Sequence, residues 1–239
     1  MAMHARLSPS AAGRWLSCPV SVRLSEQVPE RPAGPAAQAG TLMHSGFERA
    51  LLGKGHLTAS ELKALKQLGV TSERACQMVD DGVSAARALL SRYCLTEFLT
   101  EHRVNPGARI GRTDFWGTAD VVAACERQGV LLVTDFKTGR VPVPPEENAQ
   151  MLAYAAGCLD LLTFEPSRVV LAILQPPVWG DQPCVWETDL ATLHAFEAYA
   201  RTQAALTDSP HVSPNPSEAA CQWCRARAVC PAFTHPDWA

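Results

Sequence analysis

The sequence predicts an α/β fold, with helices on a mixed central β-sheet, a helical N-terminal part and a Cys-rich C-terminal tail. Helical patterns fill the first part of the chain; three extended segments, a helix, two more extended segments and a helix follow. Apolar residues make up 47% and charged residues 19% of the 239 residues, so a packed core is expected and disorder is excluded as the dominant state.

Local signals define the helices expected before the sheet. Ser8 and Pro9 have the residue types of an N-cap and a first helical position. Thr58 and Glu61 form the pattern of a capping box. Residues 25–37, rich in Pro, Gly and Ala, predict a loop. The expected helices are a short one from Ser8 to about Cys18, residues 38–52, one that starts at Thr58, and residues 72–94.

Extended segments separated by turn residues predict the strands of the sheet. The Pro-Pro-Glu-Glu run at 144–147 is expected to open a helix, because proline and acidic residues favour a first helical turn. Expected strands cover 97–104, 115–124, 129–136, 168–174 and 184–187, a last helix covers 190–206, and a Pro-rich stretch at 209–216 leads into the cysteines.

Charge and hydropathy limit the function classes. The net charge of −3, from 21 basic and 24 acidic side chains, excludes the strongly basic profile of a protein that coats nucleic acid. No run of about 18 apolar residues exists, so we expect no transmembrane helix and no membrane partner. The N-terminus lacks an apolar signal core, and we therefore expect a cytoplasmic protein.

Two carboxylates and a lysine form the most informative pattern. Residues two apart on a strand share a face, so Asp135 and Lys137 point the same way, and hairpin pairing brings Asp120 beside Asp135. Burial of such charges requires compensation, which a divalent cation supplies, and oxygen ligands suit Mg²⁺ or Mn²⁺. Lys137 would then orient or deprotonate a water that attacks phosphorus. The alternative is a surface Asp–Lys pair at an exposed strand end.

Three further residues belong to this hypothesis. His44, on the helix expected at 38–52, offers a nitrogen ligand to the metal. Gln150 and Tyr154 are four residues apart on one helix face, from which they could contact a nucleotide or brace the lysine. The structural alternatives are a histidine without a ligand role and a helix that packs Tyr154 on the sheet.

These motifs, in this order and spacing, resemble the RecB-like branch of the PD-(D/E)xK nucleases, over about residues 8–232. Phage-encoded relatives of the CRISPR adaptation nuclease are the members that the chain resembles most. The resemblance implies a restriction-endonuclease-like core with a catalytic Lys137. It also implies metal binding by His44, Asp120, Asp135 and the carbonyl of Phe136. Glu101 resembles an acidic residue that some members add to this site.

Cysteines gather at the end of the chain. Cys221, Cys224 and Cys230 form a C-x₂-C-x₅-C pattern, which indicates a metal centre that lacks one ligand, and Cys18 is the best candidate for the fourth. Spacing alone leaves an iron–sulfur cluster, a zinc site and free thiols open. The nuclease resemblance implies a structural [4Fe–4S] cluster that ties the two chain ends together.

The resulting hypothesis is a single nuclease domain over 1–239, with a mainly helical part at 1–95, a nuclease core at 96–206 and a Cys-cluster tail at 207–239. The tail is expected to pack against the N-terminal helix near Cys18. The expected activity is metal-dependent hydrolysis of DNA, as an exonuclease on ends or single strands, in phage or prophage DNA processing or recombination within a bacterial host cell.

Two other functions stay open from the sequence. One is a catalytically inactive DNA-binding or assembly protein that retains the nuclease fold, and the other is a zinc-stabilised interaction module. Arg14, Arg112 and Arg140 are candidate phosphate contacts, because arginine forks match phosphate oxygens. The partners expected are single-stranded DNA or a duplex with ends, a recombination partner protein, and further copies of the chain in a homo-oligomer.

Overall fold

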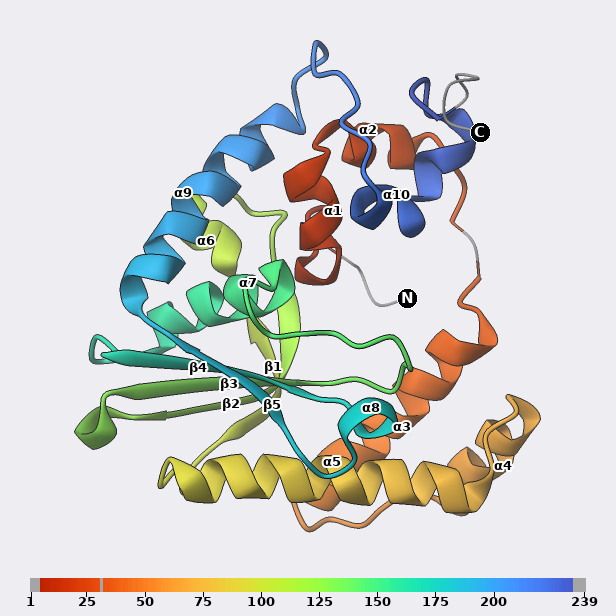
Figure 1. Cartoon of the computed structure of the whole chain (residues 1–239), viewed down its shortest axis with the longest axis vertical. Helices are drawn as coiled ribbons and strands as arrows, with labels where there is room; N and C mark the ends of the chain where they lie inside the picture. The colour runs from red at the N-terminus through yellow and green to blue at the C-terminus, as the bar shows by residue number, and fades with distance from the viewer. Residues whose placement is uncertain (1–4, 31, 234–239) are drawn as a thin grey trace.

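A five-stranded mixed sheet in the order β1-β2-β3-β4-β5 forms the centre of the protein (Figure 1). This computed structural model describes residues 5–30 and 32–233. Strand β3 runs parallel to β4, and the other neighbouring pairs are antiparallel. The predicted α/β class with a mixed, helix-flanked sheet is confirmed. The strands are β1 (Leu99–Val104), β2 (Gly117–Cys125), β3 (Val130–Phe136), β4 (Arg168–Leu174) and β5 (Cys184–Thr188).

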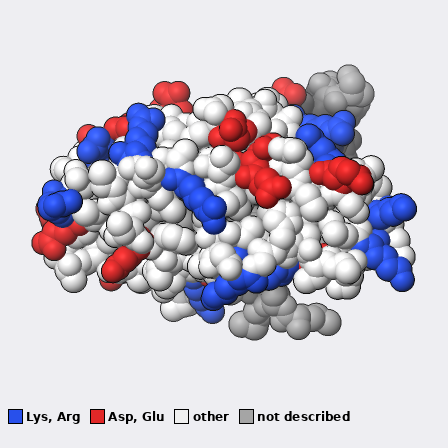
Figure 2. Space-filling view, turned by 90° about the horizontal axis from the view of Figure 1, so that it is seen from below, with Lys and Arg blue, Asp and Glu red and all other residues white. Residues whose placement is uncertain are grey.

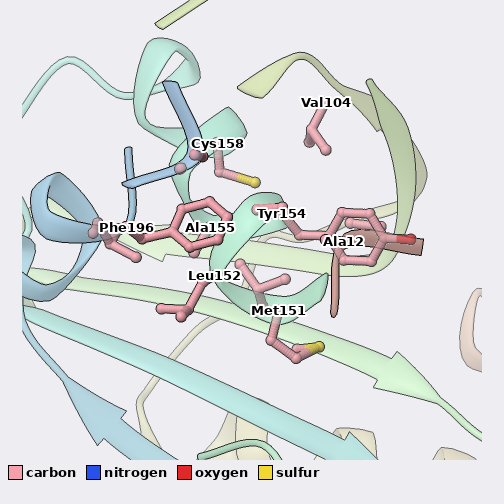
Figure 3. Close-up of a cluster of buried hydrophobic side chains, with 14 of the residues drawn as sticks. Ala12, Val104, Met151, Leu152, Tyr154, Ala155, Cys158 and Phe196 are labelled. Carbon is pink, nitrogen blue, oxygen red and sulfur yellow. The ribbon is translucent and has the colours of Figure 1, made fainter. Parts of the chain in front are cut away.

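One face of the sheet carries α7 (Ala149–Cys158), with α6 (Pro106–Ile110), α9 (Leu190–Leu206) and α1 (Ala12–Ser17) packed around it (Figure 1). Short 3₁₀ turns precede α1 and follow α7, at Pro9–Ala11 and Leu159–Leu161. Side chains from all these helices meet in one buried apolar cluster, part of which Figure 3 shows. Since nearly every residue of α7 is buried in it, this helix has a fixed position over β3.

The opposite face is covered by α3 (Pro35–Leu51) and α5 (Ser72–Arg92), with α4 (Ala59–Gln67) beside them (Figure 1). Phe47 of α3 stacks on Phe136 at the end of β3, with ring centroids 4.6 Å apart. A Cβ on Gly82 of α5 would lie 2.6 Å from the Phe136 ring, so this glycine permits the close approach of α5. Both helices therefore pack against Phe136, at the strand end that carries the Asp-Phe-Lys sequence.

The N-terminal helices and the C-terminal tail lie together (Figure 1). Helix α2 (Val20–Glu26) follows α1, and the tail contributes α10 (Glu218–Gln222) and a 3₁₀ turn at Arg225–Val229. The Arg225 guanidinium donates hydrogen bonds to the Ser25 carbonyl, and the Asn215 amide donates one to the Ser17 carbonyl. The N-terminal helices and the described part of the tail are therefore joined by polar contacts as well as by a small apolar cluster around Cys18.

Some expected boundaries were wrong. The Pro-Pro-Glu-Glu run does not open a helix, because Glu147 has a left-handed φ of 51° and Asn148 is the N-cap of α7. The Asn148 side chain accepts hydrogen bonds from the backbone N–H groups of Gln150 and Met151. These bonds cap the helix at Asn148, so its first turn begins at Ala149. Part of the loop expected at 25–37 is helical, since α2 and α3 extend into it. Ser8 precedes the first helical turn but makes no capping hydrogen bond through its side chain. The short helices α2, α6, α8 (Pro176–Trp179) and α10 were not predicted.

Charges of both signs are scattered over the surface that Figure 2 shows, in keeping with the small net charge. None of the described helices combines the length and apolar character that crossing a bilayer requires.

An ion-pair cluster joins Arg6, the segment before β2 and the residues just after α9. Arg112 pairs with Asp114 and Asp208, and Arg6 also contacts Asp208, at 2.7 Å. The hydrogen-bonding Arg112 guanidinium lowers the pKa of both carboxyl groups. A lowered folded-state pKa stabilises the fold at pH values above the ordinary aspartate pKa, and this stabilisation is lost as the pH falls through the lowered values.

We therefore expect Arg112→Gln to reduce the melting temperature at pH 7, with a difference from wild type that shrinks below about pH 4. The partial exposure of these side chains keeps the effect modest. Thermal unfolding from about pH 3 to 7 measures it. Arg127→Gln, in an exposed turn, is the matched control. An equal deficit at every pH would contradict the assigned ion pairs.

Candidate active site

Three carboxylates lie on adjacent strands where β3 ends. The pairing of β2 with β1 on one side and β3 on the other places Asp120 between Glu101 and Asp135. Asp120 and Asp135 are buried, and Glu101 lies at the exposed edge of the sheet with a left-handed φ of 45°. Asp120 Oδ2 accepts a 2.6 Å hydrogen bond from the Phe136 backbone N–H. The first carboxylate is thus fixed directly to the strand that carries the second.

A histidine from α3 completes this group. His44 is three residues before Phe47, so the stacking of Phe47 on Phe136 turns the same side of α3 toward the strand end. The His44 Nδ1 atom lies 3.4 Å from Asp120 Oδ2. One donor atom each from His44, Glu101 and Asp120 lie within 4.8 Å of one another. The side chains that the sequence analysis singled out as ligands therefore include three that converge in space.

Lys137, Gln150 and Tyr154 form a hydrogen-bonded chain beside the carboxylates. Lys137 Nζ lies 2.6 Å from Asp135 Oδ2 and 3.1 Å from Gln150 Oε1. The Gln150 amide donates hydrogen bonds to Asp135 Oδ1 at 2.9 Å and to the Tyr154 hydroxyl at 3.0 Å. Gln150 thus contacts both charged residues, whereas the sequence hypothesis of a bracing role concerned the lysine alone. Its place on α7 makes this possible, since α7 is fixed over β3.

The carboxyl groups of the site lie in surroundings that solvate their negative charge poorly. Burial raises the pKa of Asp135, although the nearby Lys137 partly opposes this effect. Desolvation of the carboxyl group, with Asp120 nearby, raises the pKa of Glu101 to about 7. Burial lowers the pKa of Lys137, but the Asp135 carboxylate outweighs it and the net pKa is raised. Lys137 therefore carries its proton as an ammonium in the protein without metal.

The donor set fits a divalent cation. Burial alone would lower the pKa of His44, yet the hydrogen bond and charge of Asp120 raise it. Each raised carboxyl pKa reports an anion that lacks sufficient compensation, and a bound cation supplies that compensation. Carboxylate oxygens with one imidazole nitrogen are ligands that suit Mg²⁺ or Mn²⁺. Such a centre can polarise a phosphate ester and activate water.

Gln175 is a site-shaping residue that the sequence analysis missed. It follows β4, the parallel neighbour of β3, and is buried at the same end of the sheet. Its amide donates hydrogen bonds to the carbonyls of Gly139 and Val141, and its oxygen accepts one from the Val143 N–H. Gln175 therefore holds the loop that follows Lys137. A polar residue between an apolar strand and two prolines was the available signal.

Gln175→Ala is expected to lower the free energy of unfolding by about 1–3 kcal/mol, because three backbone groups of the loop lose their hydrogen bonds to the buried Gln175 side chain. Urea denaturation, read by far-UV circular dichroism, measures this change. Gln182→Ala is the matched control, since the exposed Gln182 side chain donates its hydrogen bond to the exposed Asp181 rather than to a loop. A denaturation midpoint for Gln175→Ala equal to that of wild type would contradict the loop-holding role.

The four cysteines of the predicted metal centre line one small cavity between the N-terminal helices and the tail. Cys18 is buried, and its sulfur accepts a hydrogen bond from the Asn215 backbone N–H at 3.4 Å. Burial raises the pKa of the Cys18 thiol, an effect that backbone N–H donors from Asn215 and Ser21 oppose. A metal would stabilise the thiolates more strongly. The cavity is lined by Cys18, Cys221, Cys224 and Cys230 among its residues.

The three candidate phosphate contacts lie in different settings. Arg140 is exposed in the loop just after Lys137. The Arg112 guanidinium is already paired with two carboxylates. Arg14 lies on α1, and its buried Nε atom has no hydrogen-bond partner in the described part of the chain. Only Arg140 thus combines exposure with a position next to the carboxylate–lysine group.

Comparison with known families matches residues 4–237 to the model described as "Protein of unknown function (DUF2800)". The chain belongs to this family. Among solved structures, this DUF2800 member is similar to the protein SSO0001, with 14% identity, a TM-score of 0.43, and coverage of 96% of this chain and 87% of that one. It is also similar to a "Putative exonuclease" from Eubacterium rectale, with 12% identity, a TM-score of 0.42 and the same coverage.

Proposed function

We propose that the protein is a metal-dependent deoxyribonuclease of the RecB-like PD-(D/E)xK type that hydrolyses phosphodiester bonds. The observation that carries this proposal is the convergence of Asp120, Asp135, Lys137 and His44 at one end of the sheet. A surface Asp–Lys pair would not account for two buried aspartates and a partly buried glutamine of α7 whose amide contacts both the lysine and Asp135. Chemistry on a charged ester accounts for all of these features.

His44, Asp120, Asp135 and the carbonyl of Phe136 are the ligands that we propose for Mg²⁺ or Mn²⁺. The closeness of Glu101 to His44 and Asp120 supports its addition to this set. When bound, the metal supplies Lewis-acid activation of the phosphate and a more acidic water. The chain's own contribution is to hold these oxygens and the imidazole together, through the Phe136 N–H and the packing of α3.

Lys137 has the electrostatic role in the proposed reaction. Its ammonium, held between Asp135 and Gln150, can donate to a phosphate oxygen or to the attacking water and so stabilise the charge that develops. Gln150 keeps the lysine and Asp135 in register, and Tyr154 in turn accepts from the glutamine amide. Burial of Tyr154 raises the pKa of its phenol above the ordinary value, so the hydroxyl group stays protonated.

The cysteine cavity supports a second proposal, that Cys18, Cys221, Cys224 and Cys230 hold a [4Fe–4S] cluster. Its role would be structural, because the cavity lies between the two chain ends and the cysteines come from both. The cluster would supply cross-links between α1, α10 and the turn that follows. Zinc bound by the same thiolates is the alternative, and metal analysis of the purified protein distinguishes the two.

The proposed substrate is DNA with ends or a single strand, and the proposed setting is phage or prophage DNA processing in a bacterial cytoplasm. We treat the chain as one nuclease unit in which the cysteine tail braces the N-terminal part. We also propose, from the sequence, binding to a recombination partner protein and assembly of the chain into a homo-oligomer. An inactive DNA-binding protein with the same fold is the competing function, and the following assay separates it from the nuclease.

The test is a digestion time course on end-labelled single-stranded and double-stranded DNA, with Mg²⁺ or Mn²⁺ and with chelator. Anaerobically purified wild type should degrade DNA only with metal, and the fate of the label gives polarity. DNA binding without cleavage under every metal condition would overturn the nuclease and favour the inactive binding protein. The absence of both binding and cleavage would contradict both functions.

A further inference from the structure

A groove of about 470 Å³ lies between α3, the beginning of α5 and the loop after β3. Its walls include Ala36 and Met43 from α3, Arg74 and Met78 from α5, and Thr138 and Arg140 from the loop. The groove thus combines apolar side chains from two helices with two arginines on opposite elements. Nothing in the proposed metal chemistry uses this feature.

The groove adjoins the candidate active site. Thr138, in its wall, directly follows Lys137, and Met43, in the opposite wall, directly precedes His44. The two walls approach closely here, since a Cβ on Gly40 of α3 would lie 3.3 Å from the Thr138 hydroxyl. Because α3 and the loop touch here, a chain molecule that extends from the groove to the carboxylates would lie across this contact.

The charge of the groove is one-sided. Arg74 and Arg140 are exposed, and neither guanidinium has a hydrogen-bond or ion-pair partner within residues 5–30 and 32–233. Among the described residues that line the groove, none is acidic, although the whole chain has a net charge of −3. The neighbouring site, by contrast, is rich in carboxylates. Uncompensated arginines beside such a site favour an anionic ligand with more than one charge.

We propose that this groove binds a segment of single-stranded DNA next to the phosphate that is cleaved. Arg74 and Arg140 contact its phosphates, and the Met43 and Met78 side chains contact sugars and unstacked bases. A duplex would present phosphates alone and leave the apolar walls without a partner, whereas a single strand offers both kinds of group. The inference rests on the proposed nuclease and names the form of DNA that it accepts.

Binding measured without cleavage tests the groove directly. In the Lys137→Ala background with chelator, we would titrate a fluorescent single-stranded oligonucleotide and a hairpin-capped duplex against Arg74→Glu and Arg140→Glu. Each change should weaken single-strand binding by about tenfold, reduce the salt dependence, and affect the duplex less. The matched control is Arg127→Glu, an equal charge reversal in the exposed turn between β2 and β3. It should change the dissociation constant by less than about twofold.

Cleavage kinetics separate failure of this inference from failure of the nuclease. With Lys137 intact, Arg74→Glu should raise KM for single-stranded DNA and leave kcat nearly unchanged, since it removes binding that is equal in the ground and transition states. If wild type cleaves DNA but the groove variants have the same KM and dissociation constant as Arg127→Glu, the proposed DNA-binding role of the groove is overturned. The proposed nuclease activity would then stand. Binding that depends on both arginines, without any wild-type cleavage, would support the groove and overturn the nuclease. Melting temperatures of all variants check the fold.

Discussion

Lys137→Ala is expected to reduce metal-dependent DNA cleavage by at least about 10²–10³-fold, the usual cost of removing one preorganised electrostatic donor. The ammonium lies against Asp135 and Gln150, so its loss removes a positive charge from the place where phosphate charge develops. The fold should persist, because the Gln150 amide still donates to Asp135 and α7 stays anchored by its buried face. Asp135 would regain compensation by proton uptake or by the metal.

Initial cleavage rates on labelled DNA measure this effect, with the melting temperature and Mn²⁺ binding by calorimetry recorded on the same sample. Lys54→Ala is the matched control, since Lys54 is an exposed lysine on the turn after α3. Cleavage by Lys137→Ala at a rate near that of wild type would remove Lys137 from the mechanism. A variant that fails to melt cooperatively would show that the residue is needed for folding, which contradicts the expected separation of roles.

Cys224→Ala is the second change with a large expected effect. If the cavity holds the proposed [4Fe–4S] cluster, this change should remove the brown colour and most of the iron that the cluster would give the wild type, and it should reduce soluble yield sharply. Besides hydrogen bonds to α1 and α2, the tail has only a small apolar cluster around Cys18 to hold it among the described residues, and α10 has five residues. A helix this short is unstable without tertiary support, so thiolate–metal bonds would supply most of its folding free energy.

Iron and zinc analysis, visible absorbance and limited proteolysis of the tail test this prediction after anaerobic purification. Cys94→Ala, which changes an exposed cysteine outside the cavity, should retain the metal and the protection of the tail. A soluble wild type that is colourless and free of iron would overturn the cluster. Stoichiometric zinc in that protein, lost in Cys224→Ala, would assign the cavity to the zinc alternative.

The sequence by itself determined the order and type of the main elements, because each depends on local periodicity and local capping. The helix expected at 190–206 is present with these bounds as α9, and the capping box of Thr58 and Glu61 is present at α4. Alternation along β3 placed Asp135 and Lys137 on one side, and hairpin pairing brought Asp120 beside them. These features follow from neighbours in the chain and from one short turn.

Tertiary structure decided what distant segments do together. The position of α7 over β3 makes Gln150 a bridge between Lys137 and Asp135, and the register of β1 brings Glu101 to Asp120. Gln175 holds a loop more than 30 residues earlier in the chain. The groove exists only where α3, α5 and that loop meet. Local pattern cannot specify these contacts, because they depend on how helices pack and how strands pair across the whole core.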